Sequence, residues 1–389
     1  MRGASFTLHH RFPILIAAGF FAVGMAFAQA VREVDCDKES LRNVVAATAP
    51  GDTLRISGTC REAVTITLDR VTLDGAGTAV FDGGFPGGGP FGPGGGAFNA
   101  MIVIDGARGV TLRGITVRNG PGGGLIVQRN AAVSLQGALI QNSYFGMVVR
   151  DSSHAEIFES EISGNTDAGL GVVNSTVDFH AQVKINRNIQ GISASGNCDL
   201  ELPGVELEAS GNKTHGILIS GCSLNIRDFG APSRITANDN GGDGLFMGGG
   251  QLVAGEPVFF VGRGPYFHEI VAANNKGSGI NLGGFASIVN LGGAVFNLSG
   301  NATGLNVSME SSVLSVGGLR VGNNDVGILA DGAGTLTLAS TTQNPSMVQN
   351  NATTDIDLRF GTRMTVSGVA VDKLKCDGTI LSRGSIRCP

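Results

Sequence analysis

Residues 212–220 read Asn-Lys-Thr-His-Gly-Ile-Leu-Ile-Ser and contain one copy of a motif: an Asn, two to four residues, a Gly, and then Ile, Leu or Met. The motif occurs nine times between Asn119 and Ile328, and successive glycines are 22 to 35 residues apart. A period of this length is typical of solenoid architectures. After each Gly, apolar residues alternate with others, as in 217–220, which predicts a strand with one buried face.

Two more short β-like stretches fit into each period, for example residues 133–136 and 138–140, separated by Gly or Ser turns. One repeat is therefore expected to be a coil of three strands and three turns. A single coil cannot bury its own inward face, so coils must stack in parallel about 4.8 Å apart. Stacking would place like residues above like residues.

This pattern resembles the right-handed parallel β-helix proteins of the pectin-lyase-like superfamily, over nearly all of the chain after residue 28. The N-terminal segment adds to the resemblance: Leu41, Val44 and Val45 fall on one helical face, and Pro50-Gly51 ends the helix. The resemblance implies an all-β fold, a single-stranded right-handed parallel β-helix of about ten to twelve coils with a short N-terminal capping helix. The cap would cover apolar core and unpaired backbone at the open end.

Composition limits the alternatives. The 389 residues include 62 Gly and are 42% hydrophobic and only 15% charged, which argues against both an ordinary helical protein and a disordered one. The net charge of -5 argues against nucleic acid as a partner.

Residues 1–28 are typical of an export signal, with Arg2 and Arg11 before an apolar run and Ala26-Phe27-Ala28 as a cleavage site. An uncleaved anchor is the competing interpretation. We expect cleavage, a secreted or periplasmic protein, a single domain over 29–389, and no later transmembrane segment. Two insertions are expected, a Gly/Pro-rich loop at 83–100 and a second at about 249–266. The first is interpreted as a tolerated loop or as a substrate-covering flap.

All six cysteines lie after residue 28, which predicts disulfides in an exported chain, with zinc ligation as the rival interpretation. Cys198 and Cys222 are one coil apart at the same apolar phase, so stacking predicts that pair. Sequence proximity suggests two more local pairs among fifteen connectivities, from Cys36, Cys60, Cys376 and Cys388.

A small acid/base patch is one candidate for catalysis. Gln190, His215 and Asp243 each precede a repeat Gly, so stacking would place them in one column, with Asp167 near it. Residues 165–167 and 214–216 also invite comparison with polygalacturonases. That comparison fails, because the paired aspartates expected between the two motifs are missing. A solvated set of polar turn residues is the alternative.

A metal site is the second candidate. If Ala155, Val177 and Cys198 point inward, then Glu156, Asp178 and Asp199 point outward in three consecutive coils. Carboxylates about 4.8 Å apart repel and would share a hard cation such as Ca²⁺. The resemblance implies the same, because pectate lyases of this superfamily hold Ca²⁺ on an outward carboxylate cluster, with Arg or Lys abstracting the proton. A charged face that discourages lateral association is the alternative.

The sequence predicts an exported β-helix protein, expected to be a monomer, that engages polysaccharide or serves as a structural envelope or extracellular module. The alternative is a Ca²⁺-dependent, pectate-lyase-like polysaccharide lyase or other carbohydrate-active enzyme. An adhesin is a third possibility.

Overall fold

The computed structural model describes residues 29–84, 99–227, 231–255, 258–259, 265–385 and 388. The predicted signal peptide at 1–28 and most of the predicted loop at 83–100 lie outside these residues. So does much of the predicted insertion at about 249–266. The division of the chain into these segments therefore stays a prediction.

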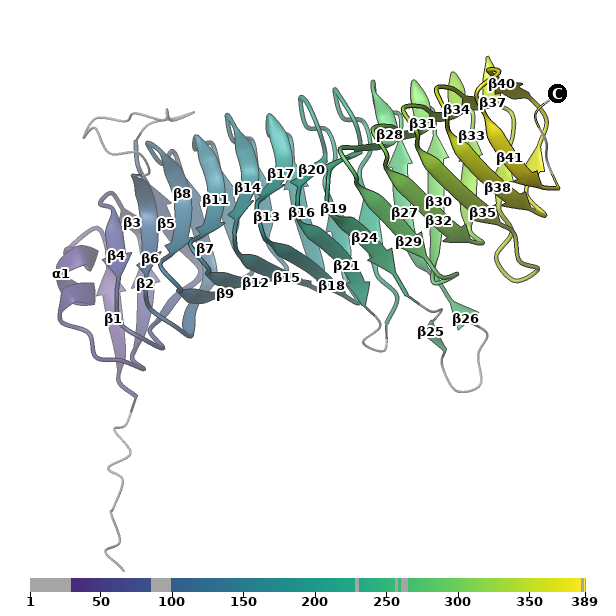
Figure 1. Ribbon diagram of the computed structural model, residues 1–389. Coiled ribbons are helices and arrows are strands. Elements are labelled where there is room, and N and C mark those ends of the chain that lie inside the picture. The colour runs from purple at the N-terminus through teal and green to yellow at the C-terminus, as the bar shows by residue number, and fades with distance from the viewer. Residues whose placement is uncertain are drawn as a thin grey trace, which may run out of the picture.

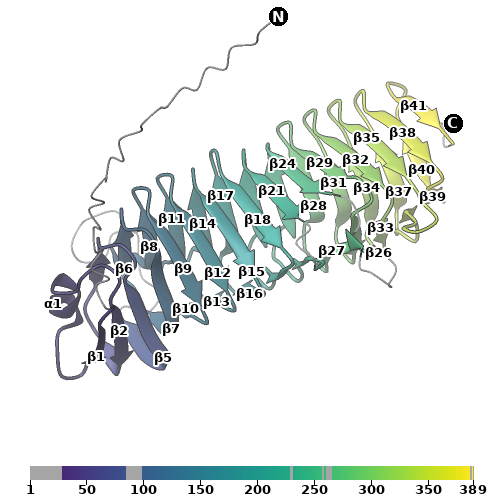
Figure 2. The same cartoon turned by 90° about the horizontal axis from the view of Figure 1, so that it is seen from below.

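The described residues form an elongated stack of coils that runs from the N-terminal to the C-terminal end (Figures 1 and 2). Each coil contributes strands to three faces, and every pairing along the stack is parallel. Face 1 is a sheet of thirteen strands: β4 (Val64–Ile66), β6 (Ala100–Asp105), β8 (Gly123–Gln128), β11 (Phe145–Arg150), β14 (Ala168–Val173), β17 (Gln190–Ser195), β20 (Ile217–Ser220), β23 (Leu245–Gly248), β28 (Ser278–Gly283), β31 (Thr303–Val307), β34 (Val326–Ala330), β37 (Thr354–Leu358) and β40 (Leu374–Cys376).

Faces 2 and 3 belong to one sheet of 26 strands, because the long strands β5 (Thr72–Asp82) and β7 (Val110–Arg118) run through both. The other strands of face 2 are β1 (Val31–Asp35), β2 (Thr53–Ser57), β9 (Ala132–Gln136), β12 (His154–Phe158), β15 (Thr176–His180), β18 (Asp199–Pro203), β21 (Ser223–Arg227), β24 (Gln251–Ala254), β29 (Ser287–Asn290), β32 (Ser312–Val316), β35 (Thr335–Ala339), β38 (Arg363–Ser367) and β41 (Leu381–Gly384). Those of face 3 are β3 (Thr59–Cys60), β10 (Leu139–Gln141), β13 (Glu161–Ser163), β16 (Gln182–Asn186), β19 (Glu206–Glu208), β22 (Arg234–Thr236), β27 (His268–Ala273), β30 (Ala294–Ser299), β33 (Leu319–Gly322), β36 (Met347–Val348) and β39 (Ala370–Val371).

One helix and one pair of short strands depart from this pattern. Helix α1 (Leu41–Ala46) lies at the N-terminal end of the stack and packs against β4, with Leu41, Val44 and Val45 buried (Figure 1). Its N-cap Ser40 accepts a hydrogen bond from the backbone N–H of Asn43, which satisfies one donor at the helix start. The short strands β25 (Val258–Phe259) and β26 (Pro265–Tyr266) pair antiparallel with each other and join neither sheet.

The repeat motif explains the core. The apolar residue after each repeat Gly occupies one register position on face 1, so that its side chains stack through the interior. This stack is fully or almost fully buried along the described coils and consists of Leu125, Met147, Leu170, Ile192, Ile217, Leu245, Ile280, Leu305 and Ile328. Ile356, which follows Asp355 rather than a Gly, continues it by one coil.

The repeat Asn forms a second internal stack, the asparagine ladder, at the turn between faces 3 and 1. Each ladder side chain is buried, its Nδ2 donates to Oδ1 of the Asn in the next coil, and that Oδ1 also accepts the backbone N–H of the first residue. The ladder comprises Asn165, Asn188, Asn212, Asn240, Asn275, Asn301, Asn324 and Asn351. It ends on Asp355, whose Oδ1 accepts from Asn351. The ladder thereby gives hydrogen-bond partners to turn N–H groups that would otherwise be buried without them.

Three disulfides staple the stack, and all three predicted pairs are present: Cys36–Cys60, Cys198–Cys222 and Cys376–Cys388. Cys198 and Cys222 lie in adjacent coils with Cα atoms 4.7 Å apart, as stacking requires. Disulfides persist in oxidising compartments, which favours a location outside the cytosol. Within the described residues, no helix has the length and apolar character needed to cross a bilayer.

Acid is expected to loosen the C-terminal coils. Asp357 on β37 is buried, and its hydrogen bonds and charge interaction with Arg359, aided by Lys375, hold the pKa of its carboxyl below the usual value. A lowered pKa in the folded state means that the stabilisation is complete above about pH 4 and is lost as the pH falls further. Hydrogen exchange should therefore increase in residues 354–385 below about pH 4. In Asp357→Asn, whose side chain does not titrate, this part of the increase should be absent; an identical pH response in the variant would contradict it.

Candidate functional site

The outward positions of face 2 form a column of carboxylates, but its members differ from those predicted. Glu156, Asp178 and Glu201 are in register on β12, β15 and β18. Asp199 pairs with Thr176 instead, two residues away from the column. The prediction that Asp199 completes the column with Glu156 and Asp178 is therefore wrong, and Glu201 takes its place.

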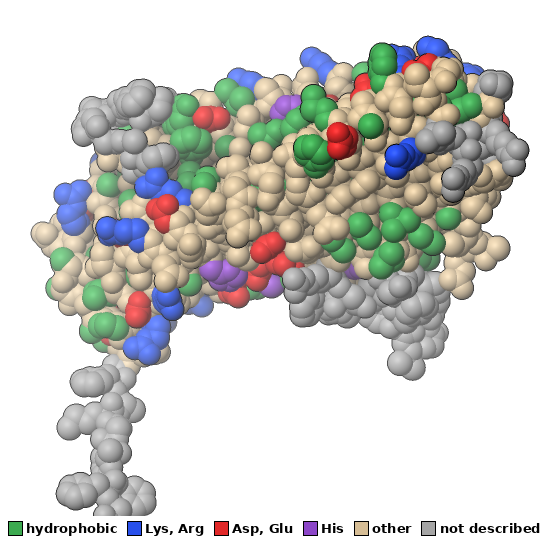
Figure 3. All heavy atoms as spheres, viewed as in Figure 1, with side chains coloured by type: hydrophobic (Ala, Val, Ile, Leu, Met, Phe, Trp, Pro, Cys, Tyr) green, Lys and Arg blue, Asp and Glu red, His purple; other side chains and the backbone are tan. Residues whose placement is uncertain are grey.

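A histidine joins two of these acids. His154 lies two residues before Glu156 on β12, so both side chains point outward, and one potential ligand atom from each of His154, Glu156 and Asp178 lies within 4.8 Å of the other two. His154 Nε2 is 3.9 Å from Asp178 Oδ2, beyond hydrogen-bond distance. In Figure 3 histidine and acidic side chains gather on the side where Figure 1 shows β12, β15 and β18.

The surroundings of this cluster leave polar atoms without partners. Asp178 Oδ1 and His180 Nε2 are buried atoms that form no hydrogen bond within the described part of the chain. The imidazole of His180 stacks on the ring of Phe158, with centroids 4.3 Å apart. Neither Glu156 nor Asp178 forms an ion pair with a Lys or Arg of the described residues, so the negative charges face each other uncompensated.

The donor set does not fit the Ca²⁺ expected from the resemblance. Ca²⁺ takes six to eight oxygen ligands, whereas this cluster offers one imidazole nitrogen and two carboxylates. The next carboxylate in the column, Glu201, already accepts a hydrogen bond from Asn225 Nδ2 at 3.1 Å. Nitrogen together with carboxylate oxygen suits borderline ions such as Zn²⁺ better.

His215 and Asp243 meet, as their column predicts. They occupy adjacent coils, with His215 Nδ1 3.5 Å from Asp243 Oδ2. His215 Nδ1 accepts the backbone N–H of Asp243 at 3.2 Å, so a neutral imidazole would carry its proton on Nε2. The Asp243 carboxylate accepts the backbone N–H of Ser278 and the Nδ2 of Asn281. These bonds hold the carboxylate in place within the turn.

Asp167 is not brought to this pair. The backbone carbonyl of Asp167 accepts the N–H of Gln190, which lies in the next coil. Gln190 in turn lies one coil before His215. Two coils, or about 10 Å, therefore separate Asp167 from His215. The Asp167 side chain accepts a hydrogen bond from the Tyr144 hydroxyl, which together with burial raises the pKa of Tyr144 above its usual value. The structure thus pairs Asp167 with Tyr144, and the predicted catalytic role of Asp167, His215 and Asp243 stays a prediction.

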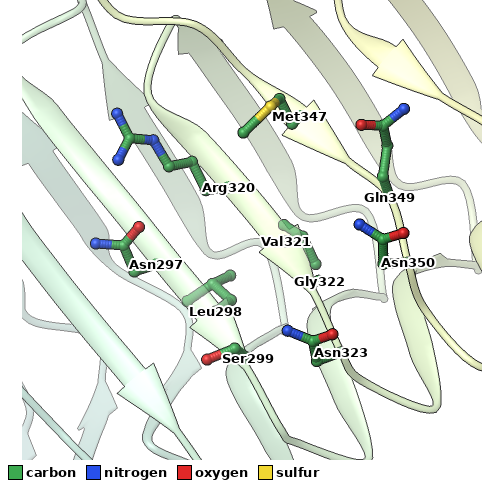
Figure 4. Close-up of a pocket in the computed structure, with 10 residues that line it drawn as sticks. All are labelled: Asn297, Leu298, Ser299, Arg320, Val321, Gly322, Asn323, Met347, Gln349 and Asn350. Carbon is green, nitrogen blue, oxygen red and sulfur yellow. The ribbon is translucent and has the colours of Figure 1, made fainter.

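A groove on face 3 was not anticipated from the sequence. It crosses β30, β33 and β36 and has a volume of about 250 Å³ (Figure 4). Its lining includes four amide side chains, one cation and one thioether, which are Asn297, Asn323, Gln349, Asn350, Arg320 and Met347, together with Leu298, Ser299, Val321 and Gly322. Register places Arg320 directly between Asn297 and Met347 of the neighbouring coils, as Figure 4 shows.

The groove exists because one outward position lacks a side chain. Gly322 lies between Ser299 and Gln349 in register, and a Cβ on Gly322 would come within 2.9 Å of the Gln349 carbonyl oxygen. At the rim, Asn297 Nδ2 donates to Glu269 and Gln349 Nε2 donates to Asp372. Both amides are thereby oriented and keep their carbonyl oxygens as acceptors.

Comparison with known proteins agrees with this architecture. Residues 100–253 match the family model described as "Right handed beta helix region". The chain folds as a right-handed parallel β-helix. No curated protein matches this β-helix chain in sequence.

Among solved structures, the β-helix is similar to pectate lyase Pel9A (12% identity, TM-score 0.35, covering 90% of this chain and 79% of that one). It is also similar to an alginate lyase from Paenibacillus sp. str. FPU-7 (11%, TM-score 0.31, 90% and 99%). A third similar structure is PfbA, a surface adhesin of Streptococcus pneumoniae (9%, TM-score 0.31, 90% and 91%).

Proposed function

We propose that this β-helix protein is exported and binds an acidic polysaccharide in the groove of face 3. The observation that carries the proposal is Arg320, an exposed guanidinium with no ion-pair partner among the described residues, set in a groove of side-chain amides. An arginine matches a carboxylate or sulfate with two parallel hydrogen bonds. An anionic sugar would supply the negative charge with which Arg320 has no ion pair among the described residues.

The rest of the lining suits the hydroxyl groups of a sugar. The oriented amides of Asn297 and Gln349 present carbonyl oxygens that accept from hydroxyl groups, and Asn323 and Asn350 add exposed amides at the adjoining turns. Amide side chains both donate and accept, which is what a polyhydroxylated ligand requires. The groove spans three coils and is open, so a chain longer than one residue fits along it.

Disulfides and the predicted export signal support an extracellular or periplasmic setting, where structural polysaccharides are found. The alternative of a polysaccharide lyase is tested by the ultraviolet absorbance of the protein mixed with the same polysaccharides, because cleavage by a lyase produces unsaturated ends that absorb there. Binding without such a signal is the outcome that the groove predicts.

Arg320→Gln is expected to weaken binding of polygalacturonate or alginate by about tenfold, because one charge-assisted contact is lost. Arg363→Gln on β38 is the matched control: it removes the same charge from an exposed position on face 2 and should leave affinity unchanged. Affinity electrophoresis against acidic and neutral glycans would measure both variants. Equal affinity of the two variants, or equal binding of neutral dextran, would contradict the proposed groove.

A further inference from the structure

We propose that His154, Glu156 and Asp178 on face 2 bind a divalent transition-metal ion, with Zn²⁺ as the reference ion. This site is separate from the groove of face 3 and does not depend on the glycan-binding proposal. Three observations support it. They are the chemical identity of the donors, the spacing between them, and two carboxylates that have no Lys or Arg partner among the described residues.

The donors have the right chemistry and spacing. One atom from each side chain lies within 4.8 Å of the other two. Zn²⁺ binds imidazole nitrogen and carboxylate oxygen at about 2.0–2.2 Å, which puts neighbouring ligand atoms about 3–4 Å apart. A contraction of about 1 Å, within reach of side-chain rotation, therefore closes the site around an ion.

The backbone holds these side chains in place. His154 and Glu156 alternate on the single strand β12, and Glu156 is in register with Asp178 on β15. Both strands are interior members of a parallel sheet, flanked by β9 and β18. Sites built on such rigid elements need little reordering when they bind an ion.

The free cluster lacks charge compensation, and a cation would supply it. Two carboxylates face each other across adjacent strands without a Lys or Arg partner in the described chain, and Asp178 Oδ1 is a buried oxygen that accepts no hydrogen bond there. His154 is too far from Asp178 to donate to it. A metal ion would turn the mutual repulsion of the acids into a shared attraction.

The site would keep open coordination positions. The side chains of His154 and Asp178 are 39% and 27% exposed, so water or an anionic group could complete the shell. Three protein ligands with an open position are the arrangement found in catalytic rather than structural zinc sites. Thiols do not compete, because all six cysteines form disulfides.

Isothermal titration with Zn²⁺, and the visible spectrum of the Co²⁺ complex, would test the proposal on untagged protein previously dialysed against EDTA. We expect one ion per chain, and a loss of affinity of roughly 30-fold or more in both His154→Ala and Asp178→Asn. Asp199→Asn is the matched control, since it neutralises a carboxylate on the neighbouring strand that register places outside the cluster. Its affinity should stay within about twofold of the unmodified protein.

Three results would overturn the proposal. They are the absence of stoichiometric Zn²⁺ binding, a loss in Asp199→Asn equal to that in Asp178→Asn, and Ca²⁺ binding as tight as Zn²⁺ binding. Far-UV circular dichroism of each variant would show that the fold is retained. None of the three substitutions removes an inward side chain, so misfolding is not expected to mask the result.

Discussion

Replacing Asn240 by Ala is expected to lower the free energy of unfolding by roughly 3–5 kcal/mol. Asn240 sits inside the asparagine ladder and is 1% exposed. Its Oδ1 accepts from both the backbone N–H and the Nδ2 of Asn212, and its own Nδ2 donates to Asn275 and to the carbonyl of Ala209. Alanine breaks all four bonds and leaves several buried polar groups without partners.

Urea unfolding followed by far-UV circular dichroism would measure this, since the chain has no Trp. Asn197→Ala is the control, because Asn197 is an exposed turn residue two coils from the substitution, and its loss should cost less than about 0.5 kcal/mol. A stack of repeats can unfold in parts. The urea concentration at the midpoint of unfolding should therefore be compared between variants as well as the slope of the transition. Similar midpoints for the two variants would show that the ladder adds little stability.

Gly244→Ala is expected to cost roughly 2–4 kcal/mol or to give insoluble protein. Gly244 follows Asn240 in the repeat, where the chain passes close to the neighbouring coil. An added Cβ would lie 2.7 Å from the Gly279 carbonyl oxygen, 2.8 Å from that of Ala237 and 2.9 Å from Asn275 Nδ2. Two of these atoms belong to backbone that the parallel sheets fix, so neither can give way cheaply.

Gly378→Ala serves as the comparison, because its Cβ would meet nothing within 4 Å. That variant should unfold at the same urea concentration as the unmodified protein. Gly137→Ala separates the two causes: its Cβ also has open space, but its φ of +57° is unfavourable for alanine, and a cost of about 1 kcal/mol is expected. If Gly244→Ala cost no more than Gly137→Ala, close coil contact would not explain the repeat glycine.

The repeat motif predicted the architecture because it reports a physical requirement that recurs in every coil. The apolar residue after each Gly must face inward, and stacking turns this requirement into the buried column from Leu125 to Ile356. The regular Asn was recognised as part of the motif, but its role was not. Only the structure shows that the amides bond to each other through the interior, because sequence spacing does not say whether a turn residue points inward.

The error at Asp199 has a definite cause. Cys198 and Leu200 are both buried, and a strand has a side-chain period of two, so aligning Val177 with either residue keeps every inward position inward. The structure aligns Val177 with Leu200, a slip of two residues that apolar alternation cannot detect. His154 was within reach of the same reasoning, because His154 and Glu156 share one face of their strand.

The groove of face 3 could not be found from the sequence, because nothing in it is a motif. Its amides come from residue types that are common at turns and on outer faces. Its depth depends on Gly322 lying between Ser299 and Gln349, which is known only once three coils are in register.

The asparagine ladder also gives the solenoid a direction. Every Nδ2 in the ladder donates toward the next coil, so the side-chain dipoles align along the axis with their positive ends toward the C-terminus. That end meets Asp355, where hydrogen bonds from Asn351, Asp372 and Lys373 outweigh the effect of burial and hold the pKa of the carboxyl below its usual value. A carboxylate accepts but cannot pass a donor onward, so Asp355 is a terminator. Extra coils that carry the ladder could therefore be inserted only before Asp355, whereas the coil after it, with β38 and β40, stacks without the ladder.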